Sequence, residues 1–256
     1  MFRPSAVLPL TLTAFLLTTP LGAQNTRGDD PDWGLDLTVG GTGLAIGHVP
    51  RVNGIRINLR DHYLEEVNGL NLTLWAPDRI QGISLGGLAV VANRELTGIS
   101  LGGLAVVGEG SMQGIHVGGL ASVSTGSFSG LTIGGLATVS EGSATGVRLG
   151  GLAVVSQGDG IGVTAGGLAT VAGEGSLTGL QLGGLAVVGN RGLTGISFGG
   201  LAVVAAEGSA TGLQAGGLAV VGAGGGLTGL NLGGLAVVAA EGEARGVNLA
   251  GLAVVG

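Results

Sequence analysis

The sequence predicts an all-β protein built as a parallel β-solenoid, with one coil for each repeat of 16 or 17 residues. Three observations lead to this fold class. A glycine-rich repeat fills the chain after residue 80, apolar residues within each repeat alternate with a period of two, and the turns between repeats are short and similar. A short fixed period marks an architecture that grows by one unit at a time, and a period of two indicates strands.

The repeat is defined by the segment Gly86-Gly87-Leu88-Ala89-Val90-Val91. Its copies begin at Gly102, Gly118, Gly134, Gly150, Gly166, Gly183, Gly199, Gly216, Gly233 and, with alanine in the first place, Ala250. We therefore divide the chain into degenerate repeats over residues 52–79 and an eleven-unit repeat domain over residues 80–256. One such unit cannot bury enough apolar surface to fold alone, so the units must stack.

The middle residue of the first strand in each unit is polar, and we expect it to face water. The positions are Ser84, Ser100, His116, Thr132, Arg148, Thr164, Gln181, Ser197, Gln214, Asn231 and Asn248. The aliphatic residues on either side, such as Ile99 and Leu101, are then expected to point inward. The candidate site is accordingly an exposed interaction row formed by His116, Thr132, Arg148, Thr164, Gln181, Ser197, Gln214 and Asn231.

The second strand of each unit leaves two arrangements open. Strict alternation through the glycines places Ala89 and Val91 inside, with Leu88 and Val90 outside. A corner at Gly86-Gly87 instead resets the alternation and turns Leu88 inward, and glycine tolerates such corners. We expect the corner.

An antiparallel β-barrel, with one strand for each repeat, is the alternative fold. A membrane barrel alternates short turns with long loops and carries aromatic girdles. Here the turns are alike, and Phe128 and Phe198 are the aromatic residues of the strong repeats, which favours the solenoid.

The N-terminus has the pattern of a secretory signal peptide. Arg3 precedes an apolar stretch over residues 6–17, and Leu21-Gly22-Ala23 is a small-residue cleavage site. We predict a signal peptide over residues 1–23 and an N-terminal cap segment over residues 24–51. The last repeat has no comparable follower, so its open edge is a candidate for self-association.

Composition excludes several functional classes. The chain has 58 glycines, no cysteine and a net charge of −6. Without cysteine there is neither a disulfide framework nor a lipid-anchored cysteine. The negative charge argues against nucleic acid and against anionic membrane surfaces, so we expect membrane contact only for the barrel alternative.

The sequence gives little support for a phosphate-binding, calcium-binding or catalytic site. The chain has no lysine, which excludes the phosphate-binding loop that ends in Gly-Lys. Single glutamates recur in the turns at Glu109, Glu141, Glu174, Glu207 and Glu241, whereas calcium needs six to eight oxygen ligands. The cluster Asp61-His62 with Glu65 and Glu66 has no partner nucleophile. We therefore predict a non-enzymatic protein with no cofactor and no metal.

The repeats resemble the surface repeat-containing proteins of spirochaetes and Bacteroidetes, whose units read approximately Gly-Leu-Gln-Ile-Gly-Leu-x-Asn. The resemblance covers about residues 52–256 and is carried by units such as Leu177-Thr178-Gly179-Leu180-Gln181-Leu182-Gly183. This chain has a second glycine where the family has leucine, and alanine where it has asparagine. The resemblance implies export and a surface position, and it supplies no catalytic residues.

These observations predict an exported scaffold or adhesion surface at the cell surface, outer membrane or periplasm, with a protein or glycan partner that the sequence does not identify. The alternative function, tied to the barrel, is an outer-membrane barrel or channel.

Overall fold

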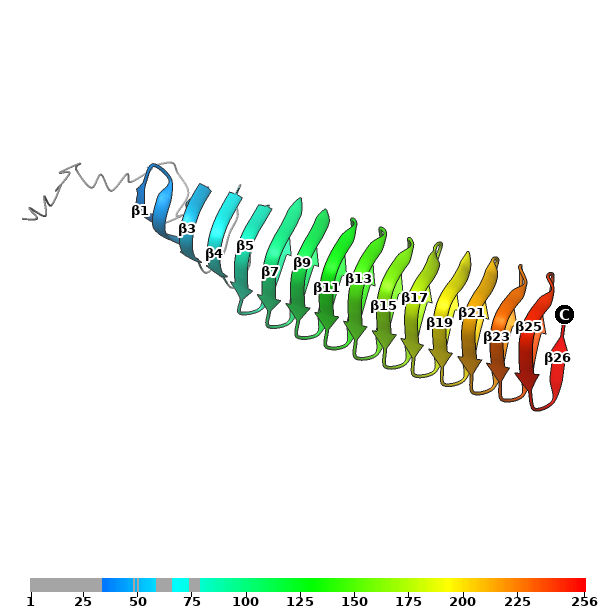
Figure 1. Ribbon diagram of the computed structural model, residues 1–256. Coiled ribbons are helices and arrows are strands. Elements are labelled where there is room, and N and C mark those ends of the chain that lie inside the picture. The colour runs from blue at the N-terminus through cyan, green and yellow to red at the C-terminus, as the bar shows by residue number, and fades with distance from the viewer. Residues whose placement is uncertain (1–33, 48, 50, 59–65, 74–78) are drawn as a thin grey trace, which may run out of the picture.

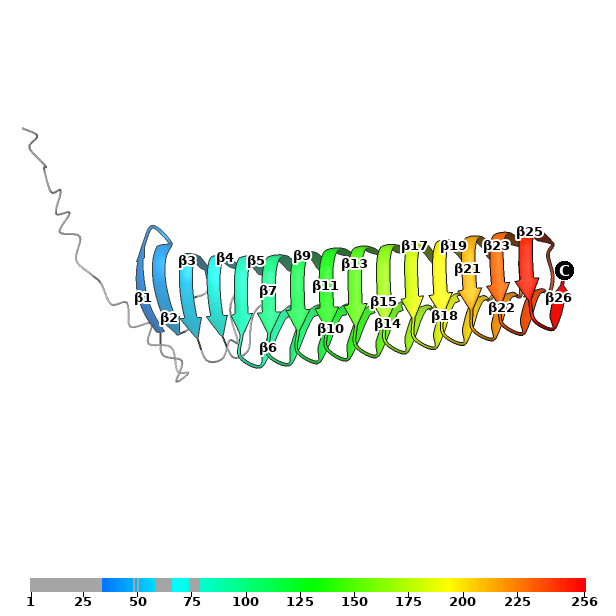
Figure 2. The same cartoon turned by 60° about the horizontal axis from the view of Figure 1, so that its bottom comes forward.

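The computed structural model describes residues 34–47, 49, 51–58, 66–73 and 79–256, and these residues form a β-solenoid (Figure 1). The coils stack along one axis into a long, narrow molecule, as a second view confirms (Figure 2). The described residues contain no helix long and apolar enough to cross a membrane. The predicted signal peptide lies outside the described residues.

One sheet, the long sheet, carries the first strand of every coil. Its strands in spatial order are β1 (Gly34–Val39), β2 (Thr42–Gly47), β3 (Arg51–Asn58), β4 (Glu66–Thr73), β5 (Arg79–Gly86), β7 (Glu95–Gly102), β9 (Ser111–Gly118), β11 (Phe128–Gly134), β13 (Ala144–Gly150), β15 (Gly160–Gly166), β17 (Ser176–Gly183), β19 (Gly192–Gly199), β21 (Ser209–Gly216), β23 (Leu227–Gly233) and β25 (Ala244–Ala250).

The second sheet, the short sheet, carries the second strand of each coil. Its strands in chain order are β6 (Ala89–Ala92), β8 (Ala105–Gly108), β10 (Ala121–Ser124), β12 (Ala137–Ser140), β14 (Ala153–Ser156), β16 (Ala169–Ala172), β18 (Ala186–Gly189), β20 (Ala202–Ala205), β22 (Ala219–Gly222), β24 (Ala236–Ala239) and β26 (Ala253–Val255).

Neighbouring coils pair in parallel, and equivalent residues lie directly beside one another. Between β17 and β19, for example, Gly179 pairs with Gly195 and Gln181 with Ser197. The parallel solenoid is thereby confirmed, and the antiparallel barrel is wrong. The one antiparallel pair among the described strands is β1 with β2, and β1 forms the first strand of the long sheet.

Glycine occupies positions where a side chain cannot fit. Gly179 lies within β17 at φ +116°, and an added Cβ would collide with the carbonyl oxygen of Gly162 in the preceding coil. At the corner between the sheets, a Cβ on Gly184 would collide with the carbonyl oxygen of Gly167. The glycines therefore permit both the backbone conformation and the close stacking of coils.

The interior holds two columns of mostly apolar side chains, one from each sheet. The long sheet contributes Leu177 and its equivalents, and the short sheet contributes Val187 and its equivalents, all of them buried in the coils before the last. The described apolar core forms three clusters: a small one from Ala45 to Val52, and two larger ones from Ile80 to Ala144 and from Ala172 to Ala239. Polar side chains occupy the interior between the two larger clusters.

A corner forms at the glycine pair, as expected, but the direction predicted for its leucine is wrong. Leu88 was predicted to turn inward, but its side chain is 49% exposed, and the equivalent leucines of the other coils are exposed as well. Val90 is fully buried instead. The corner residues extend beyond the ends of both sheets, so the side chain of Leu88 points away from the narrow interior.

Candidate interaction surface

The polar row predicted to face water lies inside the solenoid. His116, Thr132, Arg148, Thr164, Gln181, Ser197, Gln214 and Asn231 are all buried, with at most 3% of each exposed. Their predicted inward neighbours are outside, since Ile99 is 38% and Leu101 42% exposed. The prediction of an exposed row is therefore wrong, and these residues are not an interaction surface.

The buried polar side chains bond mainly to one another and to the backbone. The Thr132 hydroxyl donates to Ser122 Oγ across the interior at 2.6 Å. The Ser197 hydroxyl donates to Gln181 Oε1 of the preceding coil at 2.8 Å, and Asn231 donates to Asn248 Oδ1 at 2.8 Å. Such pairing offsets part of the desolvation cost of burying polar groups.

Arg148 is the largest polar group of this row, and the sequence around it makes room. Its guanidinium donates to Ser156 Oγ at 2.5 Å and to Thr164 Oγ1 at 3.0 Å. A Cβ added at Gly160 would collide with this guanidinium, so glycine at that position provides the space. Burial lowers the pKa of Arg148 to about 10, which leaves it charged at neutral pH.

His116 is also enclosed by the interior. Its ring meets the ring of Phe128 edge-on, with the centroids 6.2 Å apart. Burial lowers the pKa of His116 from 6.5 to about 4, because the charged imidazolium loses its hydration there. The imidazole is therefore neutral at physiological pH.

Aliphatic side chains form the outer surface on three sides of each coil. In the coil of β17 and β18 they are Leu180 and Leu182 on the long sheet, Leu185 at the corner, and Ala186 and Val188 on the short sheet. We call these five columns, repeated from Leu88 to Leu252, the apolar edge. The corner leucines before the last coil are each 45–49% exposed, and a contiguous patch of this kind marks an interaction site.

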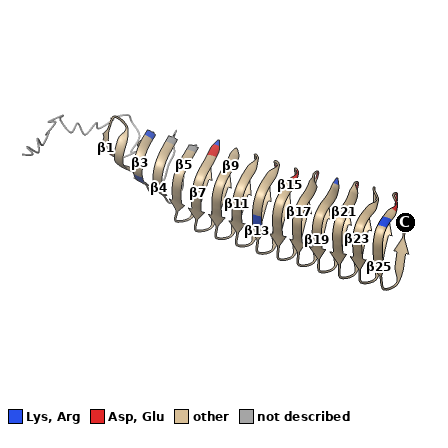
Figure 3. Cartoon of the chain, in the orientation of Figure 1, with Lys and Arg blue, Asp and Glu red and all other residues tan. Residues whose placement is uncertain are grey.

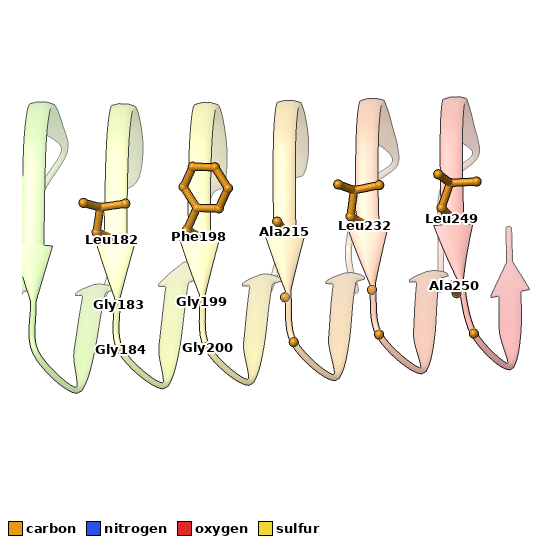
Figure 4. A pocket seen from close by; sticks show the side chains of 15 residues that line it. Leu182, Gly183, Gly184, Phe198, Gly199, Gly200, Ala215, Leu232, Leu249 and Ala250 are labelled. Atoms are coloured by element: carbon orange, nitrogen blue, oxygen red, sulfur yellow. The ribbon is translucent and has the colours of Figure 1, made fainter.

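A shallow apolar groove runs along the apolar edge beside the corner glycines. Figure 4 shows its floor at Gly183 and Gly199, with Leu182, Phe198 and Leu232 standing along one side. Similar grooves lie farther along the stack, over Ile133 and Leu149 and over Leu85 and Leu101. The groove has no charged lining residue, so it offers contact to apolar groups.

The charged residues gather at the opposite edge, in the turns that lead from the short sheet to the long sheet (Figure 3). All five turn glutamates, including Glu109 and Glu207, are exposed there. Asp159 accepts hydrogen bonds from the backbone N–H and the hydroxyl of Ser176 in the next coil, which lowers the pKa of its carboxyl group. The solenoid is thus amphipathic across its width.

The candidate cluster around Asp61 falls on a part of the chain that the structure does not describe. Asp61, His62 and Glu65 lie outside the described residues. Within the described part of the chain, no three histidine, aspartate or glutamate side chains are grouped as a metal site would require.

The sequence does not predict the apolar edge, because alternation assigns leucines such as Leu180 and Leu182 to the core and the expected corner turns Leu185 inward. A signal was present in the sequence: leucine occupies the corner and alanine the next position in all eleven units, while the polar position holds six different residue types. Side chains inside the solenoid have to fit their neighbours in adjacent coils, as the guanidinium of Arg148 fits the space left by Gly160 in the next coil.

Comparison with known proteins gives no relative. No protein-family model, no curated protein and no solved structure matches this chain.

Proposed function

We propose that this protein is an exported, non-enzymatic scaffold whose solenoid presents the apolar edge as an interaction surface. The observation that carries the proposal is the unbroken exposure of aliphatic side chains at eleven successive corners, from Leu88 to Leu252. Soluble proteins rarely expose so long an apolar strip without a partner. Export is supported by the N-terminal sequence, with Arg3, the apolar stretch and Ala23.

The role is structural because the stacked coils hold the strip straight. In-register pairing of both sheets keeps each aliphatic column in line. We expect a partner to bind through apolar contacts that extend along many coils of the apolar edge, and not through a single pocket.

Cell fractionation tests this proposal. The full chain, expressed in a bacterial host with two membranes, is expected to be processed near Ala23 and retained in a particulate envelope fraction. An edge variant with Leu152→Glu, Leu201→Glu and Leu235→Glu is expected to be processed equally but released in soluble form, because burying carboxylates against an apolar partner is costly.

A matched control carries the same charges on the same coils. The turn-side variant has Thr145→Glu, Thr194→Glu and Thr228→Glu, all exposed positions on the long sheet away from the corner. It is expected to fractionate as the wild type does. An unprocessed cytoplasmic wild type, or equal solubility of wild type and edge variant, would contradict the proposal.

A further inference from the structure

The shape of the apolar edge limits what can cover it. Aliphatic side chains lie on the long sheet (Leu180, Leu182), on the corner (Leu185) and on the short sheet (Val188). A second copy or a flat protein surface would cover one of these three sides and leave the others in water. Acyl chains are fluid and can surround all three sides at once.

The height of the apolar edge fits the interfacial zone of a bilayer. From Gly183 at the corner back to Leu180 there are three residue steps, or about 10 Å at ~3.3 Å for each residue of a strand. Elements that lie in the interface insert to a depth of about 5–10 Å, while the hydrocarbon core is about 30 Å thick. The edge is deep enough to lie in one leaflet and too shallow to span.

Backbone donors at the corner are already satisfied, which hydrocarbon requires. Gly184 N donates to Gly166 O at 3.1 Å, and both Leu185 N and Ala186 N donate to Leu168 O, at 2.7 and 3.1 Å. The same bonds recur from coil to coil along the stack.

Charged side chains lie away from the apolar edge, as binding of that edge to a membrane requires. Between residues 80 and 256, all of which are described, eleven of the twelve charged residues lie in or next to the turns opposite the corner. The remaining one, Arg148, is buried in the interior. The turns would therefore stay in water while the corner is immersed.

From these four features we infer that the apolar edge lies in the interface of a lipid bilayer, with the solenoid axis parallel to the membrane plane. The inference rests on the proposed function, since it names the occupant of that surface. The immersed line extends over ten coil steps, or about 48 Å at ~4.8 Å for each step. Because the net charge is −6, attraction to anionic lipids makes no contribution.

Vesicle flotation with the purified full chain tests the inference. The wild type is expected to float with phosphatidylcholine vesicles, in high salt as well as low, because apolar burial and not charge drives the binding. The edge variant is expected to lose binding by about tenfold or more, and the turn-side variant is expected to keep it. Circular dichroism of both variants verifies that they fold.

A depth measurement gives a second readout, since the chain has no cysteine of its own. An environment-sensitive fluorophore on Leu201→Cys is expected to shift to the blue when vesicles are added, and the same label on Thr194→Cys is expected to stay unchanged. The two positions lie on one coil, at the corner and near the turn respectively.

The outcomes separate this inference from the proposed function. Absence of wild-type flotation, or equal flotation of the edge variant, overturns the lipid inference. Equal flotation would identify another membrane-binding segment, such as the apolar residues 6–17. Should the edge variant abolish self-assembly or envelope retention while vesicles bind nothing, the scaffold proposal stands with a protein partner. Loss of both effects ends both proposals.

Discussion

Enclosure of single polar side chains is the main feature of this protein at the residue scale. His116 has no exposed surface, and its lowered pKa of about 4 means that the unfolded chain binds a proton more readily than the folded one between pH 6.5 and 4. Above pH 6.5 His116 is neutral in both states and burying it carries no protonation cost. As the pH falls from 6.5 toward 4, the unfolded chain takes up the proton first, so the free energy of unfolding decreases. The full difference corresponds to about 3 kcal/mol.

We expect His116→Gln to reduce the acid sensitivity of folding, because glutamine occupies the equivalent position in other coils and does not titrate. Guanidinium unfolding at about pH 7 and about pH 4 measures this. The wild type is expected to lose about 3 kcal/mol more than the variant on acidification. Parallel losses in the two proteins would show that His116 is not desolvated.

A second feature at this scale is the fit between the large side chain of Arg148 and the missing side chain of Gly160. The guanidinium of Arg148 occupies the space that a side chain at residue 160 would fill. Its bonds to Ser156 in the same coil and to Thr164 in the next coil link two neighbouring coils. These polar groups lie between the two larger apolar clusters of the core.

At the scale of the element, each strand of the long sheet carries both apolar and polar side chains on each of its two faces. In β17 the inward strip is Leu177, Gly179, Gln181 and Gly183, and the outward strip is Thr178, Leu180 and Leu182. Either strip taken alone could be a core strip or a surface strip.

Thiol reactivity distinguishes the two faces of one strand. Ser100→Cys is nearly isosteric and buried, whereas Leu101→Cys lies on the outside. We expect Leu101→Cys to react with a water-soluble thiol reagent at the rate of a free cysteine. Ser100→Cys is expected to react at least about tenfold more slowly, because its exposure requires local opening. Faster reaction at residue 100 would restore the assignment made from the sequence.

The sequence therefore predicts the stacked-coil architecture better than it predicts which side chains of each strand point into the interior. Repeat length and alternation are enough for parallel coils, because stacking identical units in register leaves few alternatives. The inward side could not be assigned from polarity, because Gln181 and several of its equivalents, such as Thr132 and Arg148, find hydrogen-bond partners inside. The information that reverses the assignment lies in contacts between neighbouring coils, such as those of Arg148 with Thr164 and with the space at Gly160.

For the whole molecule, interactions run between adjacent coils and seldom farther. Each strand of the main stack pairs with the strand before it and the strand after it. Stability in such a stack is approximately the sum of unit and interface terms. Loss of one coil thus removes one unit and one interface and leaves the rest of the register intact.

Deletion of residues 200–216 tests this additivity. The deletion joins Gly199 to Gly217, which follows Gly216, the in-register equivalent of Gly199, and so removes one complete coil. We expect a folded protein with unchanged ellipticity per residue and a midpoint of unfolding a few degrees lower. Deletion of residues 200–207 alone breaks the phase and is expected to unfold the coils that follow. Equal damage from both deletions would argue against independent coils.

The near identity of the coils has an evolutionary consequence. Repeats so alike in sequence are prone to unequal recombination, and an in-phase event gains or loses one whole coil without disturbing its neighbours. The length of the Leu88-type corner row would then change in single steps of about 4.8 Å. Natural variation could thus lengthen or shorten the apolar edge by whole coils. The total avidity of the edge for its partner would change, while the contact made by each coil stays the same.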